Sequence, residues 1–401
     1  MGTFDGVVIN KAEGGLNRSE ASTDAVMALV AFVDNPLTNA RNTVIELSSP
    51  LQAEALGFDA AYDANEAVLL HHHISEFFRL APNGSLKLVV TDKTTSKLFF
   101  ESAAAKAIFR EHTDVKRIGF VYNDDIAGLD LVAEINACQL FINELNSDKI
   151  FLNGIYLEAR NVSKTAVTRR TLSAAKVSLV IAQDPAIAKL DAAYSKYAAV
   201  GSVLGMRAAR KVNENLGSVD IISKPNDKKG QLTYPLTDSL KGLWLSAALS
   251  DGTAVSSLTN IEKTNLTTNG YIYAGGFQGF AGVYFNGEPT CTNVSSDYSS
   301  GENNGVWDKA ALGIRTALLP KVRGWFQRNS TTGNLRDTAI ADLENIGKKP
   351  LQVMLSASEI SGFDLVIPPS QNPNDQTPLR VIATVTLGAI IHTFEVNLSL
   401  N

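Results

Sequence analysis

Three short segments of this sequence carry the side-chain types that catalytic or metal-binding sites use. In the first, His71, His72 and His73 precede Glu76, so His72 and Glu76 stand four residues apart on one face of a predicted helix. Histidine and carboxylate at this spacing suit a transition-metal ion. A helix with one inward and two outward histidines explains the same residues, and we favour it because no second group of ligands is apparent.

The second segment, Asn123, Asp124 and Asp125, directly follows a predicted strand over 117–122. Acidic residues at the carboxyl end of a parallel strand are where α/β proteins place magnesium or phosphate chemistry. The same residue types form turns and cap the element that follows, which is the role we expect here. A cytosolic α/β enzyme that acts on a phosphorylated small molecule through Asp124 or Asp125 remains the alternative function.

The third segment is rich in glycine and spans 275–282. It is flanked by aromatic residues rather than by a strand that opens into a helix, so it predicts turns in a small sheet. Gly201 and Gly205 lie in an Ala-rich predicted helix and indicate close packing. The dinucleotide fingerprint, the phosphate-binding loop and the nucleophile elbow are all absent. We therefore expect no catalytic residue, no cofactor and no bound metal.

The composition excludes several classes of protein. The chain has 401 residues, of which 45% are hydrophobic and 19% charged, so it can bury the cores of about two or three domains. Its formal net charge of −5 argues against a dedicated nucleic-acid binder. The two cysteines, Cys138 and Cys291, are typical of buried apolar residues in a reducing compartment.

Targeting and membrane signals are also absent. The first ten residues lack the basic and apolar regions of a secretory signal. The longest purely apolar run, 25–33, is far shorter than the roughly 20 residues that a membrane span needs. These features predict a soluble protein that stays in the cytoplasm and is not inserted in a membrane.

Strands alternate with helices over the first half of the chain, which predicts a parallel sheet with helical crossovers. The predicted strands are 43–47, 86–91, 117–122, 152–157 and 177–182. One predicted helix begins at Pro50, and others cover 65–78, 102–111, 130–145, 165–175 and 197–215. The second half is predicted as α+β, with helices over 307–327, where Pro320 kinks or breaks the chain, and 338–345. Its predicted strands are 351–356, 362–367, 379–387 and 390–400.

Shifts in composition divide the chain into five segments. They are an N-terminal arm, 1–20; an α/β domain, 21–217; a variable connecting or outer region, 218–270; a C-terminal α+β domain, 271–378; and a C-terminal strand hairpin or arm, 379–401.

The two ends of the chain carry strand signals. From 392 to 400 the alternation is uninterrupted, with one face formed by His392, Phe394, Val396, Leu398 and Leu400. This pattern predicts a strand with one buried face, paired as a hairpin with 381–387. Val7, Val8 and Ile9 form a shorter strand signal in the N-terminal arm. From the residues alone we favour pairing within the chain over donation of these strands to a neighbour.

The last third of the chain resembles contractile tail sheath proteins of phage tails and phage-like contractile injection systems. The resemblance is carried by 282–287, 296–298, Asp308-Lys309-Ala310-Ala311 with Arg315, Leu318 and Pro320, 332–335, 342–344 and the two-strand ending. Upstream, 73–78 and 199–209 are also similar to sheath proteins. None of these motifs is catalytic.

The resemblance implies a structural, non-enzymatic subunit. Sheath subunits form six-membered rings stacked helically around an inner tube, and contraction drives the tube through a target envelope. Implied partners are further copies of the chain, the inner tube protein, baseplate and terminal cap proteins and, where one is present, a paralogous sheath protein. The implied location is the bacterial cytoplasm during assembly, and then a phage tail or injection-system particle. A non-contractile phage structural protein is a further alternative.

Two sets of residues acquire roles through the resemblance. Terminal strands are exchanged between neighbouring subunits, which reverses the preference for pairing within the chain and assigns exchange to Val7, Val8, Ile9, Phe394, Val396, Leu398 and Leu400. Residues 309–336 contain six basic and no acidic side chains, a pattern that also fits a solvated helix face. The resemblance implies that this helix contacts the inner tube through Lys309, Arg315, Lys321, Arg323 and Arg328.

Overall fold

The apolar strands of the first two thirds of the chain assemble into one seven-stranded sheet. The computed structural model describes residues 23–34, 41–126, 128–374, 377–392 and 394–398. The strand order is β2-β3-β1-β4-β5-β6-β9, and all neighbours are parallel except β2 and β3. The strands are β1 Val26–Phe32, β2 Val44–Leu47, β3 Ser85–Thr91, β4 Arg117–Val121, β5 Gly154–Glu158, β6 Val177–Val180 and β9 Tyr271–Ile272. The parallel sheet predicted from the sequence is confirmed.

Helices cover both faces of this sheet, as two adjacent residues of β4 show. A Cβ atom on Gly119 would lie 2.6 Å from Val200 of α8 (Val200–Ala208). The next residue, Phe120, points to the opposite face, where its ring contacts Phe99 and Phe100 of α4 (Ser96–Phe100). α8 therefore covers one face, and α4 covers the other with its neighbour α6 (Leu131–Ser147).

The other elements of this body are short. The remaining helices are α1 Pro50–Ala55, α2 Ala60–Glu66, α3 Leu70–Leu80, α5 Ala103–Glu111, α7 Pro185–Ala188 and α9 Asn260–Thr268. Two small antiparallel sheets pair β7 Ala182–Gln183 with β8 Ala248–Leu249, and β10 Ala274–Gly275 with β11 Tyr284–Phe285. The glycine-rich segment is the β10–β11 connection, as predicted. None of the helices in the described part of the chain combines the length and apolarity that crossing a bilayer requires.

Three predicted helices of the body differ from the structure for local reasons. The helix over 65–78 is split, because Ala67 adopts a left-handed conformation (φ 55°) that ends α2. Residues 165–175 form turns and a bridge, since their backbone bonds to the chain near 269–271 and 291. The helix over 197–215 stops at Ala208. There the side chains of Arg207 and Arg210 donate hydrogen bonds to backbone carbonyl oxygens further along the chain.

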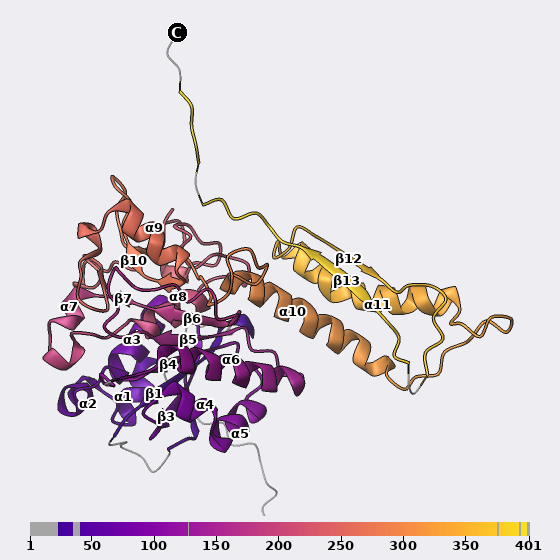
Figure 1. Ribbon diagram of the computed structural model, residues 1–401, viewed down its shortest axis with the longest axis horizontal. Coiled ribbons are helices and arrows are strands. Elements are labelled where there is room, and N and C mark those ends of the chain that lie inside the picture. The colour runs from indigo at the N-terminus through magenta and orange to yellow at the C-terminus, as the bar shows by residue number, and fades with distance from the viewer. Residues whose placement is uncertain (1–22, 35–40, 127, 375–376, 393, 399–401) are drawn as a thin grey trace, which may run out of the picture.

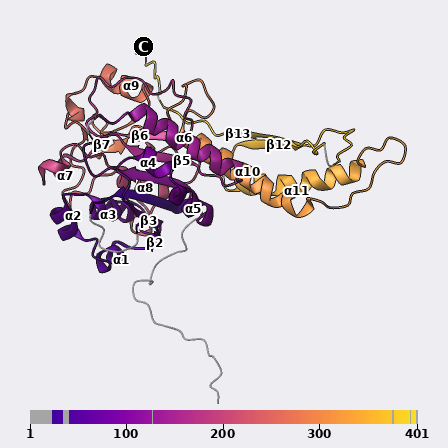
Figure 2. The ribbon, with the colours of Figure 1, turned by 60° about the horizontal axis from the view of Figure 1, so that its bottom comes forward.

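The C-terminal part is a helical hairpin with a small sheet, and it projects from the body (Figures 1 and 2). Its elements are α10 Gly301–Leu318, a 3-10 turn over Leu319–Lys321, α11 Asp337–Ser356, β12 Gly362–Val366 and β13 Ile382–Thr386. α10 packs along α11, and the antiparallel pair β12–β13 lies against α11. This unit has its own apolar core of Val306, Ala310, Leu351, Met354 and Leu365 with their neighbours.

Two predictions for this hairpin were wrong. The helix over 307–327 ends at Leu318, because Pro320 cannot continue it, so the residues beyond form a turn and a loop. The strand over 351–356 is instead the last part of α11, which continues through Pro350. The ring of Pro350 fits there because Gly313 of α10 has no side chain; a Cβ at that position would lie 2.9 Å from it.

The body also extends further along the chain than the predicted boundaries at 217 and 270 suggest. Trp244, Leu266 and Phe285 are buried in its core, and β9 is the last strand of its sheet. The first turns of α10 still pack on the body, for example through Asn304 and Asp308, and the hairpin projects beyond them.

Candidate functional site

The histidine cluster is part of the packing between two helices. His73 is buried where α8 crosses α3, and its ring Nδ1 accepts a hydrogen bond from the Gly201 N–H at 3.2 Å. A Cβ on Gly201 would lie 2.3 Å from the backbone of His73, so the prediction that these glycines permit close packing is confirmed. Burial lowers the pKa of His72 to about 4, which keeps its ring neutral near pH 7.

The carboxylate of Glu76, which would bind a metal ion together with His72, already accepts hydrogen bonds from other side chains. Glu76 accepts hydrogen bonds from Arg79, from Ser202 at 2.9 Å and from the indole N–H of Trp244 at 3.0 Å. Burial raises the pKa of Glu76, but the hydrogen bond and charge of Arg79 outweigh it and hold the pKa at about 2. Across the described residues, no group of three or more His, Cys, Asp or Glu side chains is arranged to bind a metal ion.

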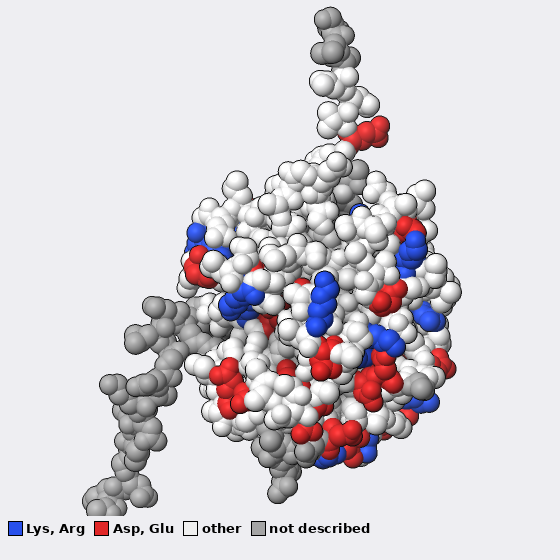
Figure 3. All heavy atoms as spheres, turned by 90° about the vertical axis from the view of Figure 1, so that its left-hand side faces the viewer, with Lys and Arg blue, Asp and Glu red and all other residues white. Residues whose placement is uncertain are grey.

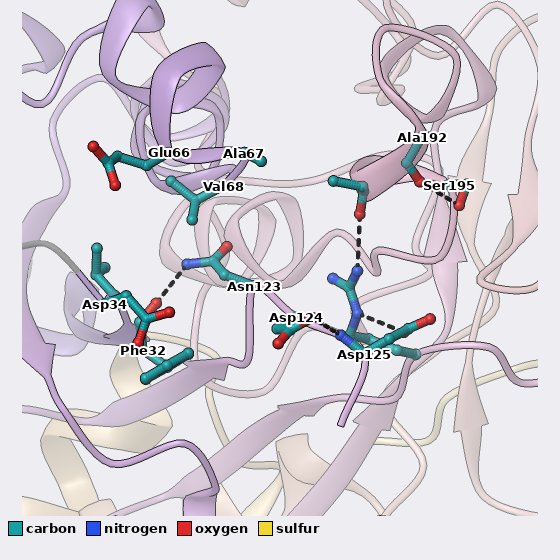
Figure 4. A pocket seen from close by; sticks show the side chains of 13 residues that line it. Phe32, Asp34, Glu66, Ala67, Val68, Asn123, Asp124, Asp125, Ala192 and Ser195 are labelled. Carbon is teal, nitrogen blue, oxygen red and sulfur yellow. Dashed lines mark hydrogen bonds and ion pairs between the residues drawn. The ribbon is translucent and has the colours of Figure 1, made fainter. Parts of the chain in front are cut away.

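Asp124 and Asp125 lie beside a cavity of about 310 Å³ at the carboxyl ends of β1 and β4 (Figure 4). Asn123, at φ 57°, donates to the carbonyl of Phe32 and so holds the two strand ends together. Asp125 pairs with Arg160 at 3.1 Å and Lys196 at 2.7 Å, while Asp124 accepts a hydrogen bond from the next backbone N–H. The turn matches the expectation from the sequence, and the ion pairs of Asp125 were not anticipated.

Alanine at His72, Asp124 and Asp125 should therefore change little. We expect each of the two aspartate substitutions to lower the free energy of unfolding by at most about 1 kcal/mol, since their interactions are exposed. His72→Ala loses an edge contact with the Tyr197 ring, 5.8 Å away between centroids, for a cost of about 1 kcal/mol. Urea unfolding and metal analysis of the purified chain would check this. A stoichiometric metal ion that disappears in His72→Ala would contradict it.

The charges on the body surface are mixed. On the face opposite the hairpin, acidic and basic side chains alternate without a continuous patch of one sign (Figure 3). Such a surface is typical of a solvated exterior.

A buried polar cluster anchors the hairpin to the body. Arg117, in β4, forms an ion pair with Glu288 and donates to the carbonyl of Gly301, the first residue of α10, at 2.8 Å. Nearby, Lys176 contacts both carboxylate oxygens of Asp308 at 2.6 and 2.7 Å. Burial raises the pKa of Asp308 to about 6 despite this lysine. The start of α10 is thus fixed to the body by the hydrogen bond from Arg117 to Gly301 and by the ion pair between Lys176 and Asp308.

Lys309, predicted to contact a tube, lies at this joint instead. Its ammonium group bonds to Asp24 at 2.6 Å and to Glu359 at 2.7 Å. Burial alone would lower the pKa of Lys309, but the two carboxylates raise it above its usual value. The lysine, which lies in α10, therefore bonds to the segment before β1 and to the turn that follows α11, and its role in a tube contact stays a prediction.

The other predicted basic residues lie near the far end of the hairpin. Lys321 is in the 3-10 turn, 3.7 Å from Asp342, and Arg328 in the following loop bonds to Asn372 and to the carbonyl of Pro373. Arg315 and Arg323 are exposed, and within the described residues the side chain of neither has an ion-pair or hydrogen-bond partner. Lys321, Arg323 and Arg328 thus lie in the turn and loop that connect α10 to α11, at the tip of the hairpin, with Arg315 in the last turn of α10.

The end of the chain leaves the hairpin as an extended arm (Figure 1). Residues 390–392 and 394–398 pair with no other described segment, and 381–387 pairs through β13 with β12. The hairpin predicted between 381–387 and 392–400 is therefore wrong. Phe394, Val396 and Leu398 are 78%, 80% and 87% exposed. Val7, Val8, Ile9 and Leu400 lie outside the described residues.

The β12–β13 sheet has room for further strands. Among the described residues it contains only these two strands, so both outer edges carry unpaired backbone N–H and C=O groups. The structure thus places open sheet edges and an unpaired apolar arm on the same unit.

Two family models together match most of the chain. The model described as DUF2586, N-terminal domain, matches residues 4–288, and that described as DUF2586, C-terminal domain, matches residues 297–401. The gap between them coincides with the entry into α10. No curated protein sequence matches this chain.

Solved structures with a similar fold come from contractile sheaths. The helical sheath of the anti-feeding prophage (AFP) in the contracted state is 16% identical, with a TM-score of 0.62 over 100% of both chains. The contracted sheath complex of the extracellular contractile injection system PVC is 12% identical, with a TM-score of 0.56 over 100% of this chain and 98% of that one. The sheath tail protein of Desulfitobacterium hafniense is 11% identical, with a TM-score of 0.50 over 95% and 100%. The fold inferred from the sequence resemblance is confirmed.

Proposed function

The chain belongs to the DUF2586 family, and we propose that it is a structural subunit of a contractile sheath. In this proposal the subunits form stacked six-membered rings around an inner tube, and contraction drives the tube through a target envelope. The observation that carries it is the match, along the full length of both chains, to the AFP sheath subunit. The mixed α/β body and the projecting hairpin are both included in that match.

The shape of the subunit supports this arrangement. The body is wide and the hairpin narrow, and the two lie at opposite ends of the molecule (Figure 1). Wedge-shaped subunits close into a ring when their narrow ends point to the axis, where the circumference is smallest. The tip of the hairpin would then face the lumen and the body the outside.

Strand exchange would link the subunits of the array. An apolar arm that pairs with no other described segment and a sheet whose edges are open among the described residues are complementary features, and addition of a strand satisfies both. We assign Phe394, Val396 and Leu398 to this contact, with Leu400 and the strand signal Val7-Val8-Ile9 of the N-terminal arm. Such tethers would keep neighbours connected while the bodies rotate.

Other parts of the particle complete the proposal. Baseplate and terminal cap proteins would bound the sheath, and a paralogous sheath protein would share it where one is present. Assembly would take place in the bacterial cytoplasm. An α/β enzyme is the weaker alternative, since Asp124 and Asp125 serve the turn and ion pairs described above.

Electron microscopy of the purified full-length chain tests this proposal. We expect long hollow polymers of uniform width with helical order. A monodisperse dimer with metal-dependent turnover would instead support the enzyme, and solid or irregular fibres would contradict a sheath.

Reversing the charge of Arg315, Lys321 and Arg323 to Glu should prevent attachment to an inner tube while polymerisation continues. These three side chains are exposed, so their pairs with a partner would set register while contributing up to about 1 kcal/mol each. Raised salt should weaken the attachment of the wild type, since the Debye length falls from about 8 Å at 0.15 M to about 3 Å at 1 M. Co-sedimentation with tubes measures both effects, and normal co-assembly by the triple variant would show that the tip points elsewhere.

A further inference from the structure

The tip of the hairpin is apolar as well as basic. Leu319, Val322 and Trp325 are 51%, 64% and 84% exposed, and they alternate along the chain with Lys321 and Arg323. The other two tryptophans are more enclosed. Trp244 is buried, and Trp307 packs its ring on Tyr298 and Phe151. Trp325 is therefore the exposed tryptophan that its own chain covers least.

The loop that carries Trp325 is held in place on both sides. Before it, the N–H groups of Val322 and Gly324 donate to the carbonyls of Leu319 and Lys321 at 3.1 and 3.0 Å. After it, Phe326 packs on a small apolar core formed by Leu335, Ile340, Leu343 and Ile367. Gly324 is required in this turn, because a Cβ there would lie 2.9 Å from the Lys321 carbonyl.

Further contacts fix the rest of the loop. Arg328 pairs with Leu335 through a backbone bridge and bonds to the carbonyl of Pro373 at 2.6 Å. Arg336 closes the loop through its N–H, which donates to the Gln327 carbonyl at 3.2 Å. The indole is thus presented on a fixed support, so little conformational freedom of this loop would be lost on binding.

We propose that Trp325, with Val322 and Leu319, is an apolar anchor that inserts into a socket on the inner tube, and that carboxylates on the rim of the socket face Lys321 and Arg323. This inference rests on the proposed function, which places the tip at the lumen. Two features specify the partner's chemistry. Aromatic and arginine side chains are enriched among residues that dominate binding energy. In addition, residues 309–336 carry no acidic side chain, in a chain whose net charge is −5.

The anchor changes what holds the sheath on the tube. A contact made by exposed charges alone would dissociate at high salt. A contact with an apolar centre and a charged rim keeps a salt-resistant part, while the rim sets register and approach. The contact expected from the sequence consists of charges alone. It therefore corresponds to the charged rim and does not include the apolar centre.

Trp325→Ala is the direct test, with tubes stripped of sheath from the particle that contains this chain as the probe. We expect the concentration of full-length chain that covers half of the tube to rise about 30-fold, as for an anchor residue. The slope of binding against salt should stay as in the wild type, whereas Arg323→Glu should alter it. Trp325→Phe should restore most of the binding. Leu240→Ala, which removes a still more exposed apolar side chain from the body, is the control and should have no effect.

Polymerisation separates this inference from the function on which it rests. Trp325→Ala should form sheaths as readily as the wild type when no tube is present. If the wild type forms no sheath or binds no tube, the proposed function fails. If the wild type binds and Trp325→Ala binds equally well, the anchor alone is wrong.

Quenching of tryptophan fluorescence by acrylamide identifies what covers the indole. Comparison of the wild type with Trp325→Phe isolates the signal of Trp325. We expect that signal to be accessible in the monomer and in empty sheaths, and protected in sheaths assembled on tubes. Equal protection in empty sheaths would place Trp325 between copies of this chain and would overturn the inference.

Discussion

Deletion of residues 390–401 should leave a folded chain that no longer polymerises. Within the described part of the single chain, 390–392 and 394–398 form no ladder, and Phe394, Val396 and Leu398 are mostly exposed, so the fold loses little when they are removed. A neighbour that receives the arm would lose a strand and the burial of these three side chains, each worth about 1.5–3 kcal/mol. Circular dichroism, sedimentation velocity and electron microscopy together measure both parts of this prediction. We expect the same outcome for deletion of residues 1–12.

Substitutions that keep the arm's length make the test specific. Phe394→Ser, Val396→Ser and Leu398→Ser combined should abolish polymers as the deletion does, because they remove the apolar face. Glu395→Gln with Asn397→Ser changes the alternate face and is the matched control, which should assemble normally. Normal tubes from either truncated chain would show that the arms are not exchanged.

The order of elements in the body could be predicted because its strands are short, continuous apolar runs. The segments that became β3, β4 and β6 are buried on both faces, and such strands are readily recognised when helices separate them. The ends of the helices were harder to predict. α8 ends where the Arg207 side chain donates to a carbonyl oxygen further along the chain. Helix propensity cannot predict such a contact.

The C-terminal part shows what alternation leaves undetermined. Period-two alternation indicates that a strand has one buried face, but it does not say which chain covers that face. The partner of β13 proved to be β12, and within the most regular strand signal of the sequence the described residues, 392 and 394–398, pair with no other described segment. The run 351–356 was misassigned because a short apolar segment fits a buried helix as well as a strand.

The basic residues of the hairpin could be found from composition, but their positions could not. Lys309 forms ion pairs with Asp24, 285 positions away in the sequence, and with Glu359. Arg323 adopts φ 62° in a loop, where helical phase has no meaning. The sequence around Trp325 and Trp307 does not tell which of the two is exposed. The exposure of Trp325 depends on how α10 ends before Pro320 and on how Phe326 packs beside it.

The joint between body and hairpin is where a single substitution should cost most. Arg117 and Glu288 are 3% and 1% exposed, and their ion pair lies beside the first turn of α10. The carboxylate also accepts a hydrogen bond from the Tyr156 hydroxyl at 2.6 Å, and the Arg117 guanidinium lies 5.5 Å from the centre of the Tyr156 ring. Gly301 leaves room for Glu288, because a Cβ there would overlap the carboxylate. Loss of Arg117 would leave the buried Glu288 carboxylate with the Tyr156 hydroxyl and, at 3.6 Å, the Arg207 guanidinium as its remaining partners.

Arg117→Met should therefore lower the free energy of unfolding by up to about 3–5 kcal/mol, the usual cost of breaking a buried ion pair, with the longer contact between Arg207 and Glu288 offsetting part of it. The double variant Arg117→Met with Glu288→Gln should be more stable than Arg117→Met alone, because it also removes the stranded carboxylate. The hydrogen bond from Arg117 to Gly301 is lost in both variants, so limited proteolysis should cut both more rapidly within 289–300, ahead of α10. The control is Arg110→Met, which breaks an exposed pair with Asp148 and should cost at most about 1 kcal/mol. Urea unfolding at concentrations too low for polymerisation measures these differences. If Arg117→Met cost no more than Arg110→Met, the buried pair and the Arg117–Gly301 hydrogen bond would not be what stabilises this joint, and the ion pairs of Lys176 with Asp308 and of Lys309 with Asp24 and Glu359 would have to carry the contact.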